Sequence, residues 1–222
     1  SSRENRNKIY WSMNDTIAKL HNADFKSIGL SDYGKYENYM ARQIARWSKQ
    51  YKDSETTLIP EMDNLIEWLP QNIPPGEETS IVHGDFRLDN MVFDKNSNEV
   101  IAILDWELST LGHPIADFTY HMMTWRMPLG VQGIGILGAN LDELNIPNEN
   151  EYAEAYYQKT NRNEIHNWDF FLAYNMFRLA GITQGIAGRV RDGTASSDQA
   201  KQYGAFVPIL SQMAWKIVEN IK

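Results

Sequence analysis

Several polar residues stand close together between two apolar runs near the middle of the chain. The stretch IVHGDFRLDNMVFD, residues 81–94, holds His83, Asp85, Arg87 and Asn90. A strand that served only to be buried would not carry them, because each polar side chain would need a partner away from water. Such a cluster indicates a loop that performs chemistry.

A further acid, Asp105, follows in ILDWE, and the DKNSN segment between the two apolar runs predicts a hairpin turn. A hairpin brings its outer ends together, so we expect Asn90 and Asp105 to be neighbours. Two such oxygen ligands, with water and phosphate completing an octahedron, suit Mg²⁺. Asp85, on the loop before the first strand, could accept a proton from a hydroxyl. Together these parts predict a phosphoryl-transfer site.

Each residue alone has a simpler explanation. Asp85, Asn90 and Asp94 could be turn or cap residues of the hairpin, since Asp and Asn favour such positions. Turn preference does not predict a fixed spacing to Asp105 across the hairpin, so the joint pattern favours a site.

The spacing is similar to the catalytic loop of the kinase-like fold, in which H-R-D-L-x-x-x-x-N precedes D-F-G. Here the loop reads HGDFRLDN and the tripeptide reads DWE. Glycine in place of the arginine resembles the aminoglycoside phosphotransferase and choline kinase-like family. The longer run to IADFTY is similar to the phosphotransferase domains that occur alone in bacteria or fused to acyl-CoA dehydrogenases. The resemblance extends from RQIARW (42–47) to residues 172–195, which is most of the chain.

The resemblance implies a role for each residue of the loop. Asp85 would be the catalytic base or hydroxyl-orienting carboxylate, and Arg87 would meet the transferring phosphate. Asn90 and Asp105 would hold Mg²⁺. The cosubstrate would be ATP or GTP, and the acceptor a small-molecule hydroxyl, with a hydroxyacyl compound suggested by the dehydrogenase-fused domains.

The resemblance also implies two supporting residues. Asp117, in HPIADF, would be the buried aspartate that braces the catalytic loop through its backbone. His83 would be structural rather than catalytic, since no second histidine accompanies it at metal-ligand spacing.

Helical periodicity surrounds the hairpin. Apolar spacing and start or stop signals predict helices over residues 8–25, 36–54, 60–72, 147–160, 167–188 and 197–221. Asn148 with Glu151 forms a capping-box pattern, and Pro208 predicts a kink or break in the last helix. We therefore predict an α+β, mostly helical fold: a single kinase-like C-terminal (large) lobe over residues 1–222, with one small β-hairpin at the catalytic loop.

The nucleotide-covering lobe of a kinase is not recognisable before the catalytic loop. The first 80 residues show neither a glycine-rich phosphate loop nor a strand pair with a lysine in a V-A-I-K setting. We therefore expect this chain to be the C-terminal lobe of a longer protein, and residues 1–222 alone to have little or no kinase activity.

Composition excludes other classes of protein. The chain has 222 residues, a formal net charge of −8 and no Lys/Arg-rich run, which argues against nucleic-acid binding. The lack of cysteine excludes disulfides, thiolate catalysis and zinc–sulfur sites. No window of about 18 apolar residues occurs, so we expect no membrane association and a cytoplasmic location. The sequence carries no signal of an oligomeric state.

Two other functions remain open. One is a noncatalytic binding or scaffold module that retains the kinase-like fold, although intact Asp85, Asn90 and Asp105 favour an enzyme. The other is a metal-dependent hydrolase using His83, Asp85 and Asp105 without nucleotide.

A second histidine pattern also needs an explanation. His113, Asp117 and His121 recur at helical spacing and could share one face as metal ligands. Pro114 instead favours a loop or cap position for His113.

Overall fold

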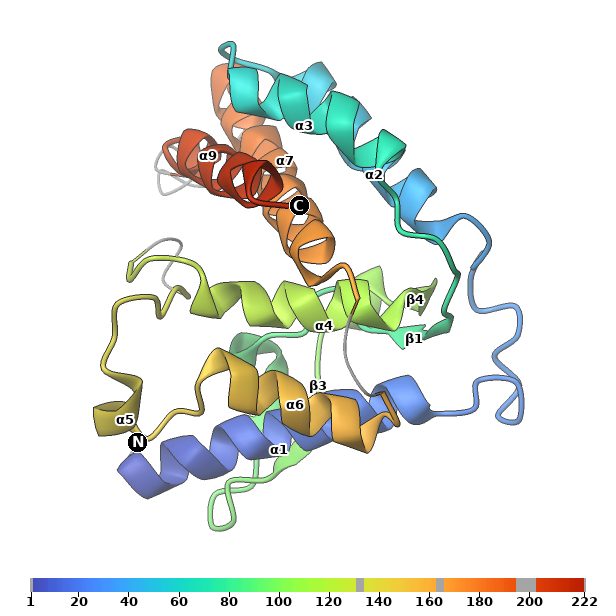
Figure 1. Ribbon diagram of the computed structural model, residues 1–222, viewed down its shortest axis with the longest axis vertical. Coiled ribbons are helices and arrows are strands. Elements are labelled where there is room, and N and C mark those ends of the chain that lie inside the picture. Colours follow the sequence, from blue (N-terminus) through green and yellow to red (C-terminus); the bar gives the residue numbers. More distant parts are fainter. Residues whose placement is uncertain (1, 131–133, 163–165, 195–202, 222) are drawn as a thin grey trace. The chain divides into compact units, whose positions relative to one another are not determined.

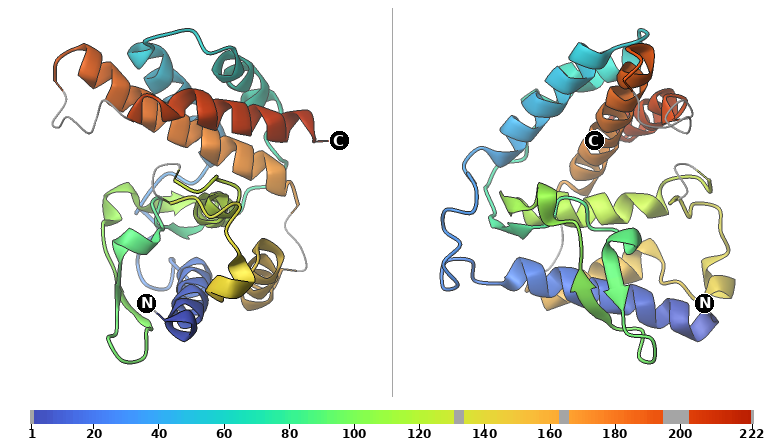
Figure 2. Two further views of the ribbon diagram at one scale, coloured as in Figure 1. Left: turned by 90° about the vertical axis from the view of Figure 1, so that its left-hand side faces the viewer. Right: turned by 180° about the vertical axis from the view of Figure 1, so that it is seen from behind.

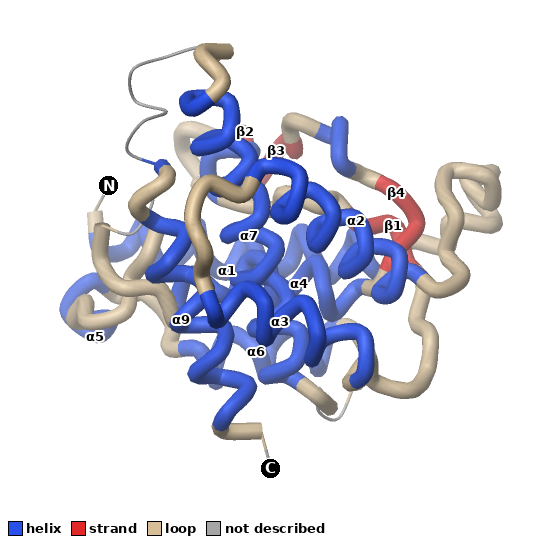
Figure 3. The backbone as a smooth tube through the Cα atoms, turned by 90° about the horizontal axis from the view of Figure 1, so that it is seen from above, coloured by secondary structure: helices blue, strands red, loops and turns tan. Residues whose placement is uncertain are grey.

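The chain folds into two compact units in the computed structural model, which describes residues 2–130, 134–162, 166–194 and 203–221. Unit 1 consists of Ser1–Glu37 and Glu77–His166, and unit 2 of Asn38–Gly76 and Asn167–Lys222. Each unit is thus built from two separate stretches of the chain (Figure 1). Helices dominate, and the strands are short (Figure 3).

The helices of unit 1 are α1 (Arg3–Asn22), α4 (Pro114–Met122), α5 (Leu141–Leu144) and α6 (Glu149–Lys159). Helices α1 and α6 lie side by side (Figures 1 and 2), with the fully buried Tyr152 of α6 stacked on the ring of Trp11. The predicted capping box is confirmed, because the Asn148 and Glu151 side chains each accept the other's backbone N–H.

The predicted hairpin is present as β2 (Met91–Phe93) and β3 (Val100–Ile103), which pair antiparallel. Its turn forms because Asp94 Oδ1 accepts the backbone N–H groups of Asn96 and Ser97 at 2.9 and 2.7 Å. The hairpin is fastened to α1, since the Val100 N–H donates to Ser12 Oγ at 2.7 Å. The second strand of the hairpin is therefore anchored to α1 at its first residue.

The prediction of a single pair of strands was incomplete. A second antiparallel pair joins β1 (Ser80–Val82) to β4 (Thr110–Gly112), with Ile81 opposite Leu111. Local pattern does not reveal it, because both strands are very short and the whole hairpin lies between them in the sequence. Helix α4 packs against β1 and follows β4 directly in the chain.

Unit 2 contains α2 (Tyr39–Ser54), α3 (Pro60–Gln71), α7 (Trp168–Arg191) and α9 (Phe206–Glu219). Helix α7 is buried along most of its length, as its nearly continuous apolar sequence predicts, and it contacts both α2 and α9. Gly188 permits a close approach to α2, because a Cβ there would lie 2.9 Å from the Cβ of Ser54.

The last predicted helix is interrupted. Its predicted first part, residues 197–202, lies outside the described residues, but Gly204 and Ala205 form a turn before α9 begins. Pro208 explains the break, since its ring would clash with the carbonyl of residue 204 in a continuous helix. Among the described helices, none is long and apolar enough to cross a membrane.

Candidate active site

The loop between β1 and β2 is held in place by Asp117 of α4. The backbone N–H groups of His83 and Gly84 donate to Asp117 Oδ2 and Oδ1, both at 2.8 Å. The ring of His21, from α1, places Nε2 3.2 Å from Asp117 Oδ2 and Nδ1 2.6 Å from the Tyr156 hydroxyl. Burial raises the pKa of Asp117, but hydrogen bonds from His21 and the two backbone groups outweigh burial and leave that pKa lowered. The buried aspartate is thus kept ionised.

His83 is fully buried, and its ring connects the loop to the end of the hairpin. Its Nε2 donates to the carbonyl of Leu104 at 2.9 Å, so its Nδ1 is the acceptor for the Asp85 N–H at 3.2 Å. The rings of Trp106 and His83 meet edge to face, with centroids 4.9 Å apart. Because both ring nitrogens serve the fold, His83 has no atom left for a metal, which argues against the hydrolase interpretation.

Asp85 is half-buried, and a donor reaches each of its carboxylate oxygens. Asn90 Nδ2 donates to Asp85 Oδ2 at 2.8 Å and to the Asp85 carbonyl at 2.9 Å. The Tyr120 hydroxyl donates to Asp85 Oδ1 at 2.6 Å. An ionised carboxylate has about four acceptor positions, so room remains for a substrate hydroxyl.

Arg87 follows on the same loop and forms an ion pair with Asp89. Burial alone would lower the pKa of Arg87, but its hydrogen bond to Asp89 and the charges of Asp85 and Asp89 raise it. Its Nε is buried and has no hydrogen-bond partner among the described residues. The guanidinium therefore lies near Asp85 with a donor still unused.

Asn90 and Asp105 occupy the outer ends of the hairpin. The Leu104 N–H donates to the Asn90 carbonyl at 2.8 Å, which extends the β2–β3 pairing to the residue before Asp105. Asp105 adopts a left-handed backbone (φ 64°, ψ 57°) at the start of a short 3₁₀ helix, Trp106–Leu108. Aspartate tolerates this conformation better than most residues do. Its side chain is exposed and has no hydrogen bond or ion pair within the described part of the chain.

The donor set fits Mg²⁺. The Asn90 amide nitrogen is used by Asp85, which leaves Asn90 Oδ1 and the Asp105 carboxylate as the oxygens that could bind the ion. Mg²⁺ commonly takes only one or two carboxylates and completes its shell with water and phosphate. No group of three or more His, Asp or Glu residues that could hold a metal occurs among the described residues.

The second histidine pattern does not form a metal site in the described structure. His113 Nδ1 accepts the Ile115 N–H at 3.2 Å and caps α4, as Pro114 suggested. His121 Nε2 lies 2.9 Å from the Tyr152 hydroxyl, and Asp117 faces the loop between β1 and β2. Each of the three side chains therefore contacts a different partner, and they do not converge on one metal position.

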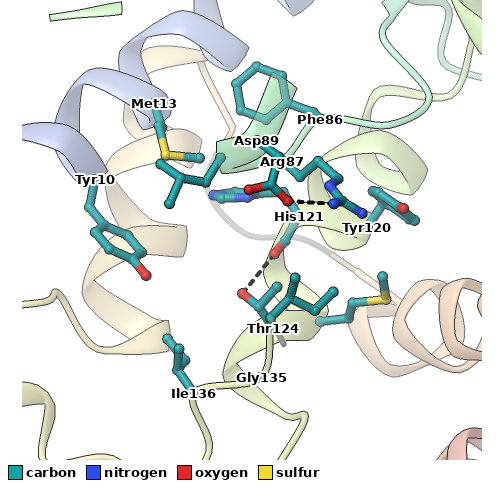
Figure 4. A pocket seen from close by; sticks show the side chains of 13 residues that line it. Tyr10, Met13, Phe86, Arg87, Asp89, Tyr120, His121, Thr124, Gly135 and Ile136 are labelled. Atoms are coloured by element: carbon teal, nitrogen blue, oxygen red, sulfur yellow. Dashed lines mark hydrogen bonds and ion pairs between the residues drawn. The ribbon is translucent and has the colours of Figure 1, made fainter. Parts of the chain in front are cut away.

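A cavity of about 230 Å³ lies beside the loop within unit 1 (Figure 4). Its apolar lining comes from α1, the loop, the residue directly after α4 and the segment after residue 133: Met13, Phe86, Leu88, Met123, Ile134 and Ile136. Arg87, Asp89 and Tyr120 provide a polar side. Because the Tyr120 hydroxyl also donates to Asp85, the cavity is lined by a residue in direct contact with the Asp85 carboxylate.

Two residues of the site were not predicted from the sequence. Tyr120 lies three residues after Asp117, so helical spacing puts both on one side of α4. This spacing could have predicted that Tyr120 lies near the loop. His21 lies on α1, far from the loop in sequence, and no local pattern marks it.

The chain matches the family model described as the phosphotransferase enzyme family over residues 1–158. It is 40% identical over 211 residues to mouse acyl-CoA dehydrogenase family member 10, covering 95% of this chain and 20% of that protein. It is 38% identical over 209 residues to human acyl-CoA dehydrogenase family member 11, covering 93% of this chain and 27% of that protein. The chain therefore spans between a fifth and a third of the length of these relatives.

Solved structures of phosphotransferases and kinases are also similar to this chain. A structure from Ralstonia eutropha, assigned as an aminoglycoside phosphotransferase, is 50% identical with a TM-score of 0.96, covering 100% of this chain and 68% of that one. A choline kinase from Cryptosporidium parvum shares the fold alone, with 11% identity and a TM-score of 0.62 over 96% of this chain and 66% of that one. The fold is thus the kinase-like phosphotransferase fold, and the chain belongs to the phosphotransferase enzyme family.

Proposed function

We propose that the protein containing this chain is a small-molecule kinase, which transfers the terminal phosphate of ATP or GTP to a hydroxyl group. The observation that carries this proposal is the fixed carboxylate of Asp85. Hydrogen bonds from Asn90 and Tyr120 reach its two oxygens, and Asp117 holds the backbone of the loop. A noncatalytic module would not need a carboxylate held this way on the loop that leads into the hairpin, with an exposed Asp105 at the hairpin's far end that has no partner among the described residues.

In this proposal Asp85 orients the acceptor hydroxyl and takes its proton as the oxygen–phosphorus bond forms, while the bond from the terminal phosphorus to the bridging oxygen breaks and ADP or GDP leaves. The Arg87 side chain is 37% exposed, and its terminal guanidinium nitrogens donate to the oxygens of the transferring phosphate. Asn90 and Asp105 would hold Mg²⁺, which neutralises charge on the phosphates. Such transfer depends almost entirely on positioning and electrostatics. In this proposal Asp85 provides the positioning and Arg87 the positive charge.

We propose that the acceptor's non-reacting part occupies the cavity beside Tyr120. The mixture of an apolar lining with the Arg87 and Asp89 charges suits a molecule with both an apolar and a polar part. A hydroxyacyl compound has this character, and several relatives carry the name acyl-CoA dehydrogenase. The chain would act as the C-terminal lobe of a cytoplasmic enzyme whose nucleotide-covering lobe lies outside residues 1–222.

The test is transfer of phosphate by the complete protein. It would be incubated with magnesium–ATP and separately with a hydroxyacyl-coenzyme A thioester, choline, ethanolamine and an aminoglycoside. We expect a phosphomonoester of one acceptor, detected by ³¹P NMR and mass spectrometry, and a magnesium-dependent rise in melting temperature with ATP. A rise in melting temperature with no transfer to any hydroxyl would favour a binding module instead.

A further inference from the structure

The hydroxyl of Tyr120 makes a contact with Asp85 that the roles described so far do not use. Tyr120 is only 5% exposed, and its hydroxyl lies 2.6 Å from Asp85 Oδ1. Asn90 Nδ2 lies 2.8 Å from the other oxygen, Asp85 Oδ2. The two donors therefore hold the carboxylate from its two ends.

Two anchors restrict the carboxylate more than one. Rotation about the Cβ–Cγ bond of an aspartate is broad and roughly two-fold, so a carboxylate with a single partner can still swing. Donors on both oxygens remove this freedom and fix the direction of the remaining lone pairs. An acceptor hydroxyl that donates to one of these lone pairs is then already oriented toward the phosphate.

Tyr120 stands on the same helix that fixes the backbone of the loop. Asp117, one turn earlier on α4, accepts the N–H groups of His83 and Gly84. All residues of α4 are buried, so the helix is a rigid base. One helix thus positions the main chain of the loop through Asp117 and the reactive side chain through Tyr120.

We infer that Tyr120 is a positioning residue of the phosphotransferase site, whose hydroxyl aims the Asp85 carboxylate at the acceptor's hydroxyl. This inference rests on the proposed function, because it assigns Tyr120 an effect that operates only through Asp85. Tyr120 acts on the rate of the chemical step and not on the binding of nucleotide.

The test is a double-mutant cycle on the complete protein. The rate of ADP formation from saturating magnesium–ATP is measured with water as the acceptor, so that no identity of the natural acceptor is assumed. Tyr120→Phe is expected to lower this rate about 10- to 100-fold, as loss of a hydrogen bond to a charged group does, with the KM for ATP unchanged. In the Asp85→Asn background, Tyr120→Phe is expected to change the rate less than about two-fold, because its target is already lost.

Tyr152→Phe is the matched control. Tyr152 is another buried tyrosine of unit 1, and its hydroxyl contacts His121 at 2.9 Å rather than Asp85. Its removal is expected to leave the rate near that of the wild type, and melting temperatures of all variants check the fold.

Three outcomes are decisive. A wild-type rate in Tyr120→Phe, with Asp85→Asn slow, would overturn the inference and leave the proposed function standing. Equal losses from Tyr120→Phe in both backgrounds would reduce Tyr120 to a structural residue, which also overturns it. A wild-type rate in Asp85→Asn would instead remove the proposed function.

Discussion

The Gly84 N–H donates to Asp117 Oδ1 at 2.8 Å, across 33 positions of the sequence. Gly84 can take this place because its φ of 83° is costly for other residues, and a Cβ there would lie 2.7 Å from the Leu108 carbonyl oxygen. The glycine that distinguishes this loop from the kinase H-R-D pattern is therefore required by its geometry.

Asp117→Asn is expected to destabilise the protein by about 2–3 kcal/mol, because an amide oxygen can replace only one of the two acceptors that His83 and Gly84 use. Turnover should fall with it, since the loop loses its brace. Urea denaturation measures the first effect and steady-state kinetics the second. Asp94→Asn, in the exposed hairpin turn, is the control, and equal stability losses in both variants would contradict the assigned role of Asp117.

The unfolding free energy should decrease as pH falls from about 6.5 toward 4. Burial lowers the pKa of His121 to about 4, opposed in part by the charge of Asp117, and burial likewise lowers the pKa of His113 to about 4. Between these values and about 6.5, the unfolded chain binds protons that the folded chain does not, so acid favours unfolding.

His121 alone should account for about 2 kcal/mol between pH 7 and pH 5. Denaturant titrations at the two pH values measure this difference. His121→Gln, which keeps a polar partner for the Tyr152 hydroxyl, should reduce it. An unchanged difference in that variant would show that His121 is not the group responsible.

Arg87→Ala is expected to lower turnover about 10²-fold with little change in the KM for ATP, if the guanidinium meets the phosphate chiefly in the transition state. Asp89→Ala is the matched comparison, because it breaks the same ion pair but leaves the guanidinium in place. A merely structural surface pair is worth about 0–1 kcal/mol, so similar small effects from both variants would reject the phosphate role.

Local signals predicted the parts of the fold that depend on neighbouring residues. The Asp94 turn, the Asn148 capping box and the break before Pro208 were readable because each is decided within a few positions. The loop residues were recognisable for the same reason, since Asp85 and Asn90 lie on one short segment.

Contacts between distant segments were not predictable in this way. The pairing of β1 with β4 depends on registry across the hairpin, and the His21 contact depends on where α1 lies against the loop. The division into two units depends on α2 and α3 packing against α7 and α9, which come much later in the chain. Apolar spacing shows that these helices bury a face, but not which helix covers it.

The role of the loop in phosphoryl transfer is tested by replacing Asp85 or Asp105 and measuring turnover of the complete protein with magnesium–ATP and the acceptor found by the transfer assay. Asp85→Asn is expected to lower turnover about 10²- to 10⁴-fold, because the acceptor hydroxyl loses its base. Asp105→Ala should do at least as much harm, because the metal would lose its charged ligand. Asp94→Asn, on the same hairpin, should retain nearly full turnover. Wild-type turnover in both Asp85→Asn and Asp105→Ala would contradict the assignment of this loop as the site of phosphoryl transfer.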